Sequence, residues 1–500
     1  MTLLIRVDAG KRMGTGHFMR CLALAQAWLE AGGKVVFVCG ESLEFLKDRL
    51  RVEELEVNFL STTPGSNEDA IQTAELAQEL KASWVVVDGY HFSAEYQRAI
   101  KQHDLRLLFI DDNGHCDHYY ADIVLNQNVH ASPELYASRE PYTRCLLGTQ
   151  YVLLRREFWG WADWTRTIPE VARKILVTLG GSDPENVTMK VITAVEQVEL
   201  DGLEATVVIG GGNPYKDQLQ LAAQGSKIPI HIESNTTRMP ELMAWADVAV
   251  SSGGSTCWEL AFMGLPHLIL VVADNQVPIA RELDKLGIAR CLGWYSTVLP
   301  EDIASHLEEL LPKMKVRSEM SGYGRQLVDG KGAKRVVKNF LDFTLTLRPV
   351  RREDCALLWK WANDPTVREV SFSLDPIPWE KHVYWFESKL ADPLCLIFIG
   401  VSQNDEPIGQ VRFELSDNDK AEIHVVIDES YRGQGYGSKL IDLAVTELFR
   451  NTSVQSVNAF VKSTNHASMR AFEKAGFKKI GAVTIKRCES LHYKRTRSYQ

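Results

Sequence analysis

Short apolar runs alternate with amphipathic stretches over the first 125 residues of the chain. Apolar positions at helical spacing predict a helix from Gly16 to about Ala31, which Gly32 and Gly33 would end. Runs rich in Val, Ile and Leu predict buried strands at residues 3–7, 35–38, 85–87, 107–110 and 123–125. Strands separated by helices are typical of a parallel sheet with helical crossovers, so we predict such a sheet here.

The same pattern restarts near Lys174. A helix is predicted from about Asn186, and apolar runs predict strands at residues 175–179, 207–209, 230–232, 248–250 and 268–272. The two halves together predict a pair of Rossmann-like lobes, in which ligands bind outside the carboxyl ends of the strands. Three tryptophans in the segment from Trp159 to Pro169 indicate a hinge or a packed crossover between the lobes.

A third unit with a different pattern begins near Leu345. A strand predicted at 345–350 and a helix predicted at 353–363 are followed by three runs typical of consecutive antiparallel strands, at 397–401, 407–415 and 421–427. A glycine-rich loop and another helix come next. We therefore predict an α/β chain of three domains, with Rossmann-like lobes at residues 1–165 and 166–343 and an α+β domain at 344–500.

Composition and charge narrow the classes of partner. The chain has 500 residues and a net charge of -9, which argues against nucleic-acid binding because phosphate contacts favour a basic surface. Arg6 and Asp8 interrupt the apolar start, which excludes a signal peptide, and no run approaches the roughly 20 apolar residues of a membrane helix. Nine cysteines without a Cys-x-x-Cys pair are typical of reduced thiols, so we expect a cytoplasmic protein.

One short segment resembles a set of metal ligands. It reads His115-Cys116-Asp117-His118, but adjacent side chains point in divergent directions and no second ligand pair at helical spacing accompanies them. We therefore expect a polar loop there and no metal.

The most specific signal is a glycine-rich loop that directly follows the strand predicted at 421–427 and opens a helix. Backbone N–H groups of such a loop approach a pyrophosphate closely, and the helix N-terminus adds partial positive charge. The residues concerned are Arg432, Gly433, Gln434, Gly435, Tyr436, Gly437 and Ser438. About 30 residues later comes the segment 463–477, which contains Asn465 and Phe472.

These two segments resemble motifs A and B of the GNAT acetyltransferases. The resemblance implies that the loop amides hold the pyrophosphate of acetyl-CoA and that Asn465 contacts the cofactor arm. Asn465 is also suited to cap a helix, and both roles are compatible. Many members carry a tyrosine as general acid where this chain has Phe472, so that role is vacant or filled elsewhere, with Tyr493 and Tyr436 as weak candidates.

The acceptor amine of such an enzyme must lose a proton before it attacks. Glu422 and His424 alternate on the strand that leads into the loop, so both face one side. Glu422 is our candidate base. A solvated strand face explains the same pattern equally well.

A second glycine-rich turn follows the first predicted strand of the chain. Gly14 and Gly16 permit close backbone approach at a helix start, and His17 lies on the first helical turn. The positive end of the helix favours a neutral imidazole that can act as a base. The alternative is a histidine that only bonds a neighbour.

The second lobe carries a matching turn between a strand and a helix. Gly254, Ser255 and Thr256 offer amides and hydroxyls that suit a diphosphate. Glu259, one turn later, is placed to accept hydrogen bonds from a ribose diol, or it is a first-turn carboxylate that interacts with the helix dipole.

Several motifs over residues 1–340 agree in order with the UDP-sugar hydrolase of pseudaminic acid biosynthesis, a GT-B family related to MurG-type glycosyltransferases. They are Gly14-Thr15-Gly16-His17, Asp111-Asp112, Asn126-Gln127-Asn128, 179–183, 264–266 and 274–276. The resemblance implies that His17 activates water, that Tyr90, Arg155 and Asn275 contact the substrate, and that Gly254, Ser255, Thr256 and Glu259 hold the uridine diphosphate.

Taken together, the resemblances imply two activities in one chain. The C-terminal part would acetylate the 4-amino group of a UDP-sugar, and the N-terminal part would hydrolyse UDP-2,4-diacetamido-2,4,6-trideoxy-β-L-altropyranose with inversion at the anomeric carbon. Three alternatives stay open: a GT-B glycosyltransferase with a modifying acetyltransferase, an inactive UDP-sugar-binding scaffold, and a GNAT unit that acts on protein amines. The oligomeric state is not indicated.

Overall fold

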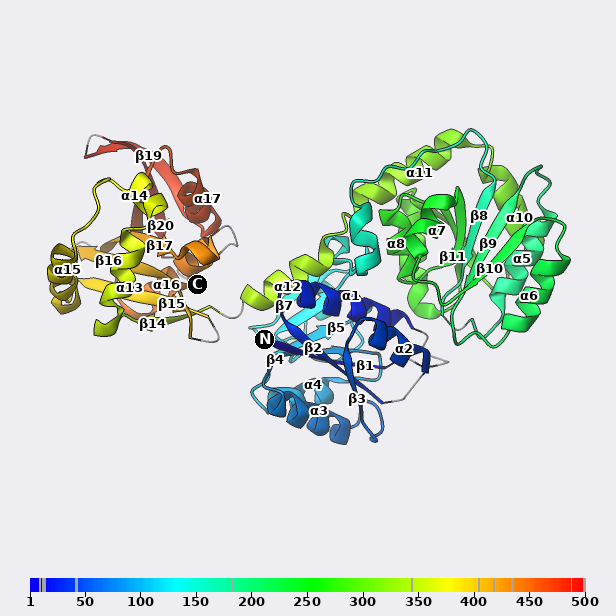
Figure 1. Ribbon diagram of the computed structural model, residues 1–500, viewed down its shortest axis with the longest axis horizontal. Coiled ribbons are helices and arrows are strands. Elements are labelled where there is room, and N and C mark those ends of the chain that lie inside the picture. Colours follow the sequence, from blue (N-terminus) through cyan, green and yellow to red (C-terminus); the bar gives the residue numbers. More distant parts are fainter. Residues whose placement is uncertain are drawn as a thin grey trace. The chain divides into compact units, whose positions relative to one another are not determined.

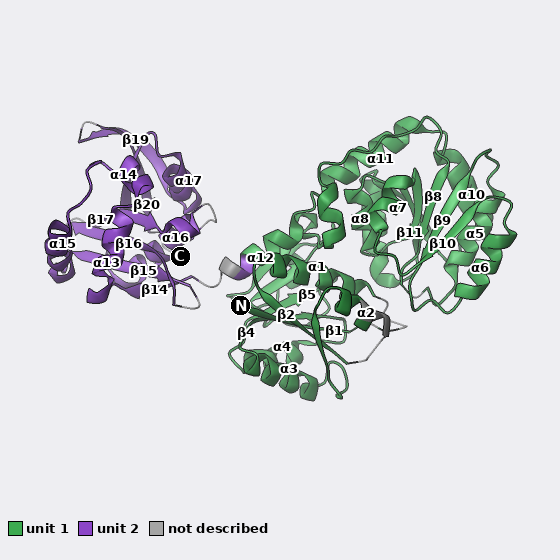
Figure 2. Ribbon diagram, in the orientation of Figure 1, with its two compact units in different colours: residues 1–338 green, residues 339–500 purple. Residues whose placement is uncertain are grey.

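The computed structural model describes residues 1–8, 10, 15–40, 44–181, 183–342, 345–402, 405–416, 419–432, 436–486 and 488–497. The chain divides into two compact units, residues 1–338 and 339–500 (Figure 2). Unit 1 holds two sheets and unit 2 holds one (Figure 1). The predicted domain boundaries at 165/166 and 343/344 stay predictions.

The first lobe of unit 1 is built on a seven-stranded sheet in which every pair of neighbours is parallel. Its central strands are continuous apolar runs because both of their faces are buried. Leu3–Ile5 and Val85–Val87 are fully buried, for example. The order across the sheet is β3 (Glu56–Phe59), β2 (Lys34–Cys39), β1 (Thr2–Val7), β4 (Ala82–Asp88), β5 (Leu107–Ile110), β6 (Ile123–Asn126) and β7 (Arg144–Leu147).

Four α-helices accompany these strands: α1 (Gly16–Glu30), α2 (Glu44–Val52), α3 (Asn67–Glu79) and α4 (Ala94–Lys101). Serines begin two of them, since Ser66 accepts a hydrogen bond from the amide of Asp69 and Ser93 accepts one from the amide of Tyr96. Three short 3-10 turns follow β6: η1 (Pro133–Tyr136), η2 (Thr149–Tyr151) and η3 (Arg156–Trp161).

The second lobe repeats the plan with a six-stranded parallel sheet. Its order is β10 (Ile230–Ser234), β9 (Glu204–Ile209), β8 (Lys174–Thr178), β11 (Val248–Ser252), β12 (His267–Val271) and β13 (Ala289–Trp294). Its helical elements are α5 (Val187–Gln197), α6 (Lys216–Gly225), α7 (Met239–Trp245), α8 (Thr256–Phe262), η4 (Asp274–Gln276), α9 (Val277–Lys285), α10 (Pro300–Leu310) and α11 (Met314–Leu327).

Both sheets reverse their strand order at one place. The reversal lies between β1 and β4 in the first lobe and between β8 and β11 in the second. Segments that leave neighbouring strands on either side of such a point run in opposite directions, which opens a crevice at the carboxyl ends of the strands. These two places are therefore where a ligand site is expected in each lobe.

Two segments join the lobes of unit 1. The tryptophan-rich segment packs on the second lobe, where Phe158, Trp161 and Trp164 contact a core cluster that includes Trp258 and Phe262. The segment is therefore a packed crossover, one of the two roles predicted for it. Helix α12 (Gly332–Asp342) returns to the first lobe, because a Cβ on Gly332 would lie 2.2 Å from the carbonyl oxygen of Val152 and Lys334 pairs with Glu30.

Unit 2 is a seven-stranded mixed sheet. The order is β14 (Thr346–Pro349), β15 (Cys395–Val401), β16 (Pro407–Ser416), β17 (Lys420–Ile427), β18 (Ser456–Lys462), β20 (Cys488–Thr496) and β19 (Lys478–Ile485). Neighbouring strands are antiparallel except β17 and β18, which run parallel. Lys420–Glu422 of β17 pairs with Ser456–Asn458 of β18, and the described pairing of these two strands ends there.

Helices cover both faces of this sheet. One core cluster joins α16 (Tyr436–Asn451) and α17 (His466–Lys474) to residues such as Val411, Phe413 and Ile423. A second cluster joins α13 (Cys355–Ala362) and α15 (Trp379–Ala391) to the opposite face of β15. The remaining short elements are η5 (Arg352–Asp354), α14 (Pro365–Val370) and η6 (Glu429–Tyr431).

Within the residues described, no helix combines the length and the apolar composition needed to cross a membrane.

Candidate functional sites

The first candidate site centres on His17, the second residue of α1. Its ring nitrogen Nδ1 lies 2.7 Å from Oδ1 of Asp88, the last residue of β4. The side chain of His17 is 9% exposed and that of Asp88 is fully buried. Helix α1 follows β1, so the pair spans the point where the strand order of the first sheet reverses.

Arg20, one helical turn after His17, holds the same carboxylate. Its Nε and Nη2 donate to the two oxygens of Asp88, each over 2.7 Å, and its Nη1 donates to Oδ1 of Asp112 over 2.7 Å. Burial raises the pKa of Asp88, but Arg20 and His17 outweigh burial and keep it below its ordinary value. Asp88 therefore stays ionised although it is buried.

Asp112, which follows β5, connects this group to the next one. It accepts hydrogen bonds from Nδ2 of Asn128 (2.7 Å) and from the hydroxyl of Tyr90 (2.6 Å). Burial opposes its ionisation, and Arg20 and Tyr90 are among the groups that hold its pKa far below the ordinary value. Burial and Asp112 raise the pKa of Tyr90, so this residue remains a neutral phenol.

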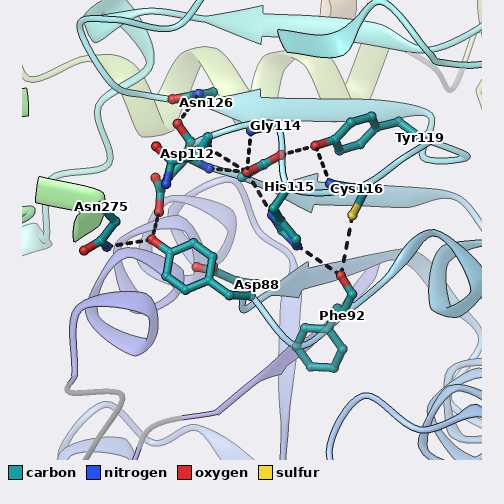
Figure 3. A network of polar contacts seen from close by, with 12 residues as sticks. Asp88, Phe92, Asp112, Gly114, His115, Cys116, Tyr119, Asn126 and Asn275 are labelled. Carbon is teal, nitrogen blue, oxygen red and sulfur yellow. Dashed lines mark hydrogen bonds and ion pairs between the residues drawn. The ribbon is translucent and has the colours of Figure 1, made fainter. Parts of the chain in front are cut away.

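A residue of the second lobe completes the network. Nδ2 of Asn275, in η4, donates to the hydroxyl of Tyr90 over 2.8 Å. Figure 3 labels Asn275 and Asp112, the two residues that hydrogen-bond to this hydroxyl. The ring of Tyr90 also meets the edge of His17 at 4.8 Å between centroids and remains 39% exposed. Tyr90 thus links His17 to the second lobe and still presents part of its ring to solvent.

The residue after Asn275 fixes the glycine-serine turn of the second lobe. Oε1 of Gln276 accepts from the amides of Gly253 and Val272, each over 3.1 Å. A Cβ on Gly253 would lie 3.0 Å from Cβ of Gln276, so a glycine is favoured there. One short segment therefore supplies Asn275 to the first lobe and holds the turn that contains Gly254.

The two lobes approach each other at the start of α1. A Cβ on Gly16 would lie 3.6 Å from the hydroxyl oxygen of Ser255, and a Cβ on Gly181 would lie 2.5 Å from that of Thr15. Ser255 and Thr256 remain partly exposed there. The structure thus brings Gly16, His17, Gly254, Ser255 and Thr256 to one place, whereas Gly14 lies outside the described residues.

Arg155 and Glu259, both predicted to contact the ligand, pair with each other. Nε and Nη2 of Arg155 donate to Oε1 of Glu259 over 3.2 and 2.9 Å, and the second carboxylate oxygen takes no part in this pair. Burial raises the pKa of Glu259 although Arg155 opposes the rise. The pair thus uses one oxygen of Glu259, and Nη1 of Arg155 contacts Oε1 of Glu157 over 3.4 Å.

The His115 cluster is structural. Nδ1 of His115 lies 3.1 Å from Oδ1 of Asp111. Its Nε2 lies 3.1 Å from the carbonyl oxygen of Phe92, and Figure 3 shows the contact of His115 with Phe92. Burial opposes its protonation, but Asp111 and Cys116 raise the pKa of His115 to about 10, so both nitrogens carry protons at neutral pH. Among the described residues, no group of three or more His, Cys, Asp or Glu side chains is placed to hold a metal ion.

The second candidate site lies in unit 2, on the face of β16 and β17 that carries Glu422 and His424. Nε2 of His424 lies 3.3 Å from Oε1 of Glu422. Burial and the cross-strand neighbour Glu414 raise the pKa of Glu422, and burial and Arg412 lower that of His424. His424 is therefore neutral at neutral pH, and Glu422 takes up a proton more readily than an ordinary glutamate.

Only part of the predicted acetyl-CoA loop is described. Gly433, Gln434 and Gly435 lie outside the described residues, and Tyr436, Gly437 and Ser438 form the first turn of α16. The guanidinium of Arg432 is bound by the carbonyl of Ile427 (2.9 Å) and by Asp364 (3.0 Å), and its amide donates to the carbonyl of Glu429 over 3.4 Å.

Helix α17 begins beside this turn. A Cβ on Gly437 would lie 3.8 Å from that of Ala471, and Asn465 accepts a hydrogen bond from the amide of Ser468 over 3.1 Å. Asn465 therefore caps α17, one of its two predicted roles. Tyr493 is almost fully buried, stacks on Phe472 and donates to Glu473 over 3.0 Å, an environment that gives little access to a leaving thiolate.

Sequence reasoning assigned no role to Asp88, Arg20 or Asp112, although two of them end or follow strands at the reversal of the sheet order. That position is the signal that would have found them. It also missed Gln276, whose role depends on the fold of the turn it holds. The roles of the predicted site residues themselves stay predictions.

Comparison with known proteins agrees with this division. Residues 344–478 match the family model of the acetyltransferase (GNAT) domain, and residues 175–336 match that of the glycosyltransferase family 28 C-terminal domain. The chain is 26% identical over 499 residues to an uncharacterized protein of Methanocaldococcus jannaschii, covering 96% of this chain and 97% of that protein.

Two further relatives match part of the chain. The spore coat polysaccharide biosynthesis protein SpsG of Bacillus subtilis is 26% identical over 334 residues, which cover 66% of this chain and 95% of SpsG. The pseudaminic acid cytidylyltransferase and UDP-2,4-diacetamido-2,4,6-trideoxy-beta-L-altropyranose hydrolase of Helicobacter pylori is 26% identical over 207 residues, 41% of this chain and 37% of that protein.

Topology and family matches confirm the predicted fold class. The chain consists of a GT-B-like pair of Rossmann-like lobes followed by a GNAT-like domain, and it combines a glycosyltransferase-like nucleotide-sugar module with an acetyltransferase module.

Proposed function

We propose that unit 1 hydrolyses UDP-2,4-diacetamido-2,4,6-trideoxy-β-L-altropyranose to UDP and the free sugar. The observation that carries the proposal is the contact of His17 with Asp88, set beside a Tyr90–Asn275 hydrogen bond that joins the lobes. A histidine held by a carboxylate suits proton abstraction from water. The Helicobacter pylori relative, whose name includes this hydrolase, supports the choice of substrate.

The site residues have separate roles in binding the substrate. Gly14, Gly16, Gly254, Ser255 and Thr256 bind the diphosphate through amides and hydroxyls. Glu259 accepts a hydrogen bond from the ribose, and Arg155 orients Glu259 and takes part in substrate binding. Tyr90 and Asn275 contact the sugar.

His17 then supports attack on the anomeric carbon. Its Nε2 takes a proton from water as the water oxygen forms its bond to that carbon. The bond from the carbon to the diphosphate oxygen breaks, UDP leaves with the electron pair, and the anomeric centre is inverted. Amides and hydroxyls of the turn at 253–256 stabilise the charge that develops on the diphosphate.

We further propose that unit 2 transfers an acetyl group to the 4-amino group of the UDP-sugar precursor. Acetyl-CoA supplies the acetyl group. The described pairing of β17 with β18 ends at Glu422, so within the described residues 423–426 of β17 pair with no strand on that edge. An open strand edge suits the extended, amide-containing arm of this cosubstrate. Glu422 takes the proton of the acceptor amine as its nitrogen forms a bond to the acetyl carbonyl carbon, the carbon–sulfur bond breaks, and CoA leaves as the thiolate.

The two proposed activities form a sequence. Acetylation in unit 2 completes the sugar that unit 1 hydrolyses, so the intact protein given UDP-4-amino-sugar and acetyl-CoA should release UDP and free diacetamido-sugar. A His17→Ala variant should stop at the acetylated UDP-sugar, with UDP release about 10²–10⁴-fold slower. NMR of the products tests this, and UDP release by the variant at the wild-type rate would exclude His17 as the base.

A second candidate function for unit 1 is glycosyl transfer to a sugar acceptor, favoured by the match to glycosyltransferase family 28. The two functions share a nucleotide site, so nucleotide binding does not separate them. UDP release without any acceptor supports hydrolysis, and release that requires an acceptor supports transfer. Tight nucleotide binding without turnover would instead indicate a scaffold, and acceptor profiling with acetyl-CoA separates sugar amines from protein amines in unit 2.

A further inference from the structure

A continuous chain of polar contacts leads from the partly exposed side chain of Tyr90 at the lobe junction to the buried surroundings of His17. It runs from Asn275 to Tyr90, Asp112, Arg20 and Asp88, and each link is 2.6–2.8 Å long. We propose that Asp88 is a positioning residue of the unit 1 site, that it fixes the tautomer and orientation of His17, and that Arg20 and Asp112 tie this setting to Tyr90. The inference rests on the proposed hydrolysis and deepens it.

The contacts of Nδ1 determine which nitrogen of His17 carries the proton. Nδ1 lies 2.7 Å from an oxygen of Asp88 and 3.0 Å from Nη2 of Arg20. A guanidinium only donates, so the two contacts cannot both be hydrogen bonds of one neutral ring. The shorter contact is to an ionised carboxylate, which requires Nδ1–H as donor, and Nη2 of Arg20 already donates to the same oxygen of Asp88 over 2.7 Å.

Nε2 of His17 is consequently the nitrogen with a free lone pair in the neutral ring. It makes no hydrogen bond to any residue within the described part of the chain. When Nε2 takes a proton from the attacking water, the ring becomes an imidazolium whose positive charge lies against Asp88. Asp88 therefore stabilises the charge that develops during the reaction and remains ionised throughout.

Arg20 prevents Asp88 from adopting another orientation. Its two donors span both carboxylate oxygens, a geometry that fixes the carboxylate plane. Its remaining nitrogen holds Asp112, which in turn accepts the hydroxyl of Tyr90. The position of Tyr90, which Asn275 contacts, thus affects the hydrogen bonds of Asp112. Through Arg20, it also affects how Asp88 holds His17.

Asp88→Asn tests the inference in the full-length protein with the UDP-sugar of the proposed reaction. We expect kcat of UDP release to fall by about 10²–10⁴-fold, because the imidazolium loses its carboxylate. KM should change by no more than a few-fold, since Asp88 is fully buried and does not reach the substrate. The loss should therefore appear in kcat of the folded variant and not in KM.

The charged and titratable groups that face His17 are Asp88 from β4, Arg20 from its own helix, Asp112 after β5 and Tyr90 after β4. Among them only Asp88 changes in this variant. Asp69→Asn is the matched control, because Asp69 is an equally buried carboxylate of the same lobe that pairs with Arg6 and does not contact His17. It should lower thermal stability and leave both kcat and KM of the folded protein unchanged.

A purely structural role of Asp88 predicts lost stability with an unchanged kcat in the folded fraction, and that result overturns the inference. If Asp88→Asn does not fold, Arg20→Lys keeps the positive charge but loses the paired donors, and kcat should then fall about 10-fold at unchanged KM. An unaltered kcat in that variant also overturns the inference. Failure of the wild-type protein to release UDP would contradict the proposed hydrolysis itself, which distinguishes the two failures.

Discussion

At the scale of single residues, the hydroxyl of Tyr90 is held from two lobes at once, by Asp112 and by Asn275. Tyr90→Phe and Asn275→Ala each remove the same interlobe hydrogen bond, so their effects on kcat/KM of UDP release should not add. We expect a coupling free energy of about 1 kcal/mol from the four proteins of a double-mutant cycle.

The matched comparison pairs Tyr90→Phe with Arg238→Ala, whose side chain is 64% exposed on the second lobe. These two changes should add, because no contact joins the residues. If Tyr90→Phe and Asn275→Ala also add within about 0.3 kcal/mol, the interlobe bond plays no part in the reaction.

Arg155 should control the ionisation of Glu259. Burial already raises the pKa of Glu259, and Arg155→Met removes the cation that opposes this rise. More of Glu259 is then protonated at a given pH, so the affinity for UDP should fall below that of the wild type at pH 7, and the difference should shrink as the pH rises. Calorimetric titration with UDP between pH 7 and 9 measures this.

Arg156→Met provides the control for that experiment, because its side chain is 50% exposed and its partner is Glu53. UDP affinity of the control should match the wild type at every pH. A pH-independent loss of affinity in Arg155→Met would mean that Arg155 contacts UDP directly and does not act through Glu259.

At the scale of elements, the start of α17 combines a cap with a predicted cofactor contact. Asn465→Ala removes the acceptor for the amide of Ser468 and should destabilise unit 2 by about 1 kcal/mol. Asn465→Ser keeps a capping oxygen but has no amide group. If Asn465 also binds acetyl-CoA, the serine variant should keep wild-type stability and show a raised KM for acetyl-CoA. A normal KM in the serine variant would leave Asn465 as a cap alone.

Buried parallel strands were the part of the fold that periodicity predicted well. Residues 107–110 are predicted as a strand and form β5, and the helix predicted from Gly16 to about Ala31 is α1 (Gly16–Glu30). Such elements succeed because burial on both faces demands continuous apolar runs. The helix predicted at 353–363 is divided, since residues 352–354 form the 3-10 turn η5 and α13 begins at Cys355.

The elements that the sequence pattern missed are short or irregular. Strand β3 reads Glu-Val-Asn-Phe at the edge of its sheet and none of its residues is buried. Strand β13 contains Gly293 at φ 106° and a register shift against β12. Strands of this kind owe their place to neighbouring strands, which a one-dimensional pattern does not record.

The candidate sites divide in the same way. Glycines and polar residues directly after strands predicted where Gly16, His17 and Ser255 would lie, because the carboxyl ends of parallel strands share one edge. The pairing of His17 with Asp88, 71 residues apart, depends on β4 lying next to β1. The pairing of Arg155 with Glu259 likewise depends on the crossover between the lobes, so neither pair could be predicted from local spacing.

At the scale of the whole molecule, each unit has hydrophobic clusters of its own, so loss of one activity should leave the other intact. Gly435→Glu places a carboxylate in the loop that the sequence assigns to a pyrophosphate, and it should abolish acetylation while hydrolysis of pre-acetylated UDP-sugar continues. His17→Ala should do the reverse. Neither variant alone should release UDP from UDP-4-amino-sugar and acetyl-CoA.

An equimolar mixture of these two variants should restore UDP release if the acetylated UDP-sugar leaves unit 2 freely. Release should begin after a lag that shortens as the concentration of the His17→Ala protein rises, because the intermediate must accumulate in solution before unit 1 of the other chain binds it. The double variant His17→Ala/Gly435→Glu gives the baseline. A mixture that releases no more UDP than the double variant would contradict free exchange and would require that both reactions occur within one chain.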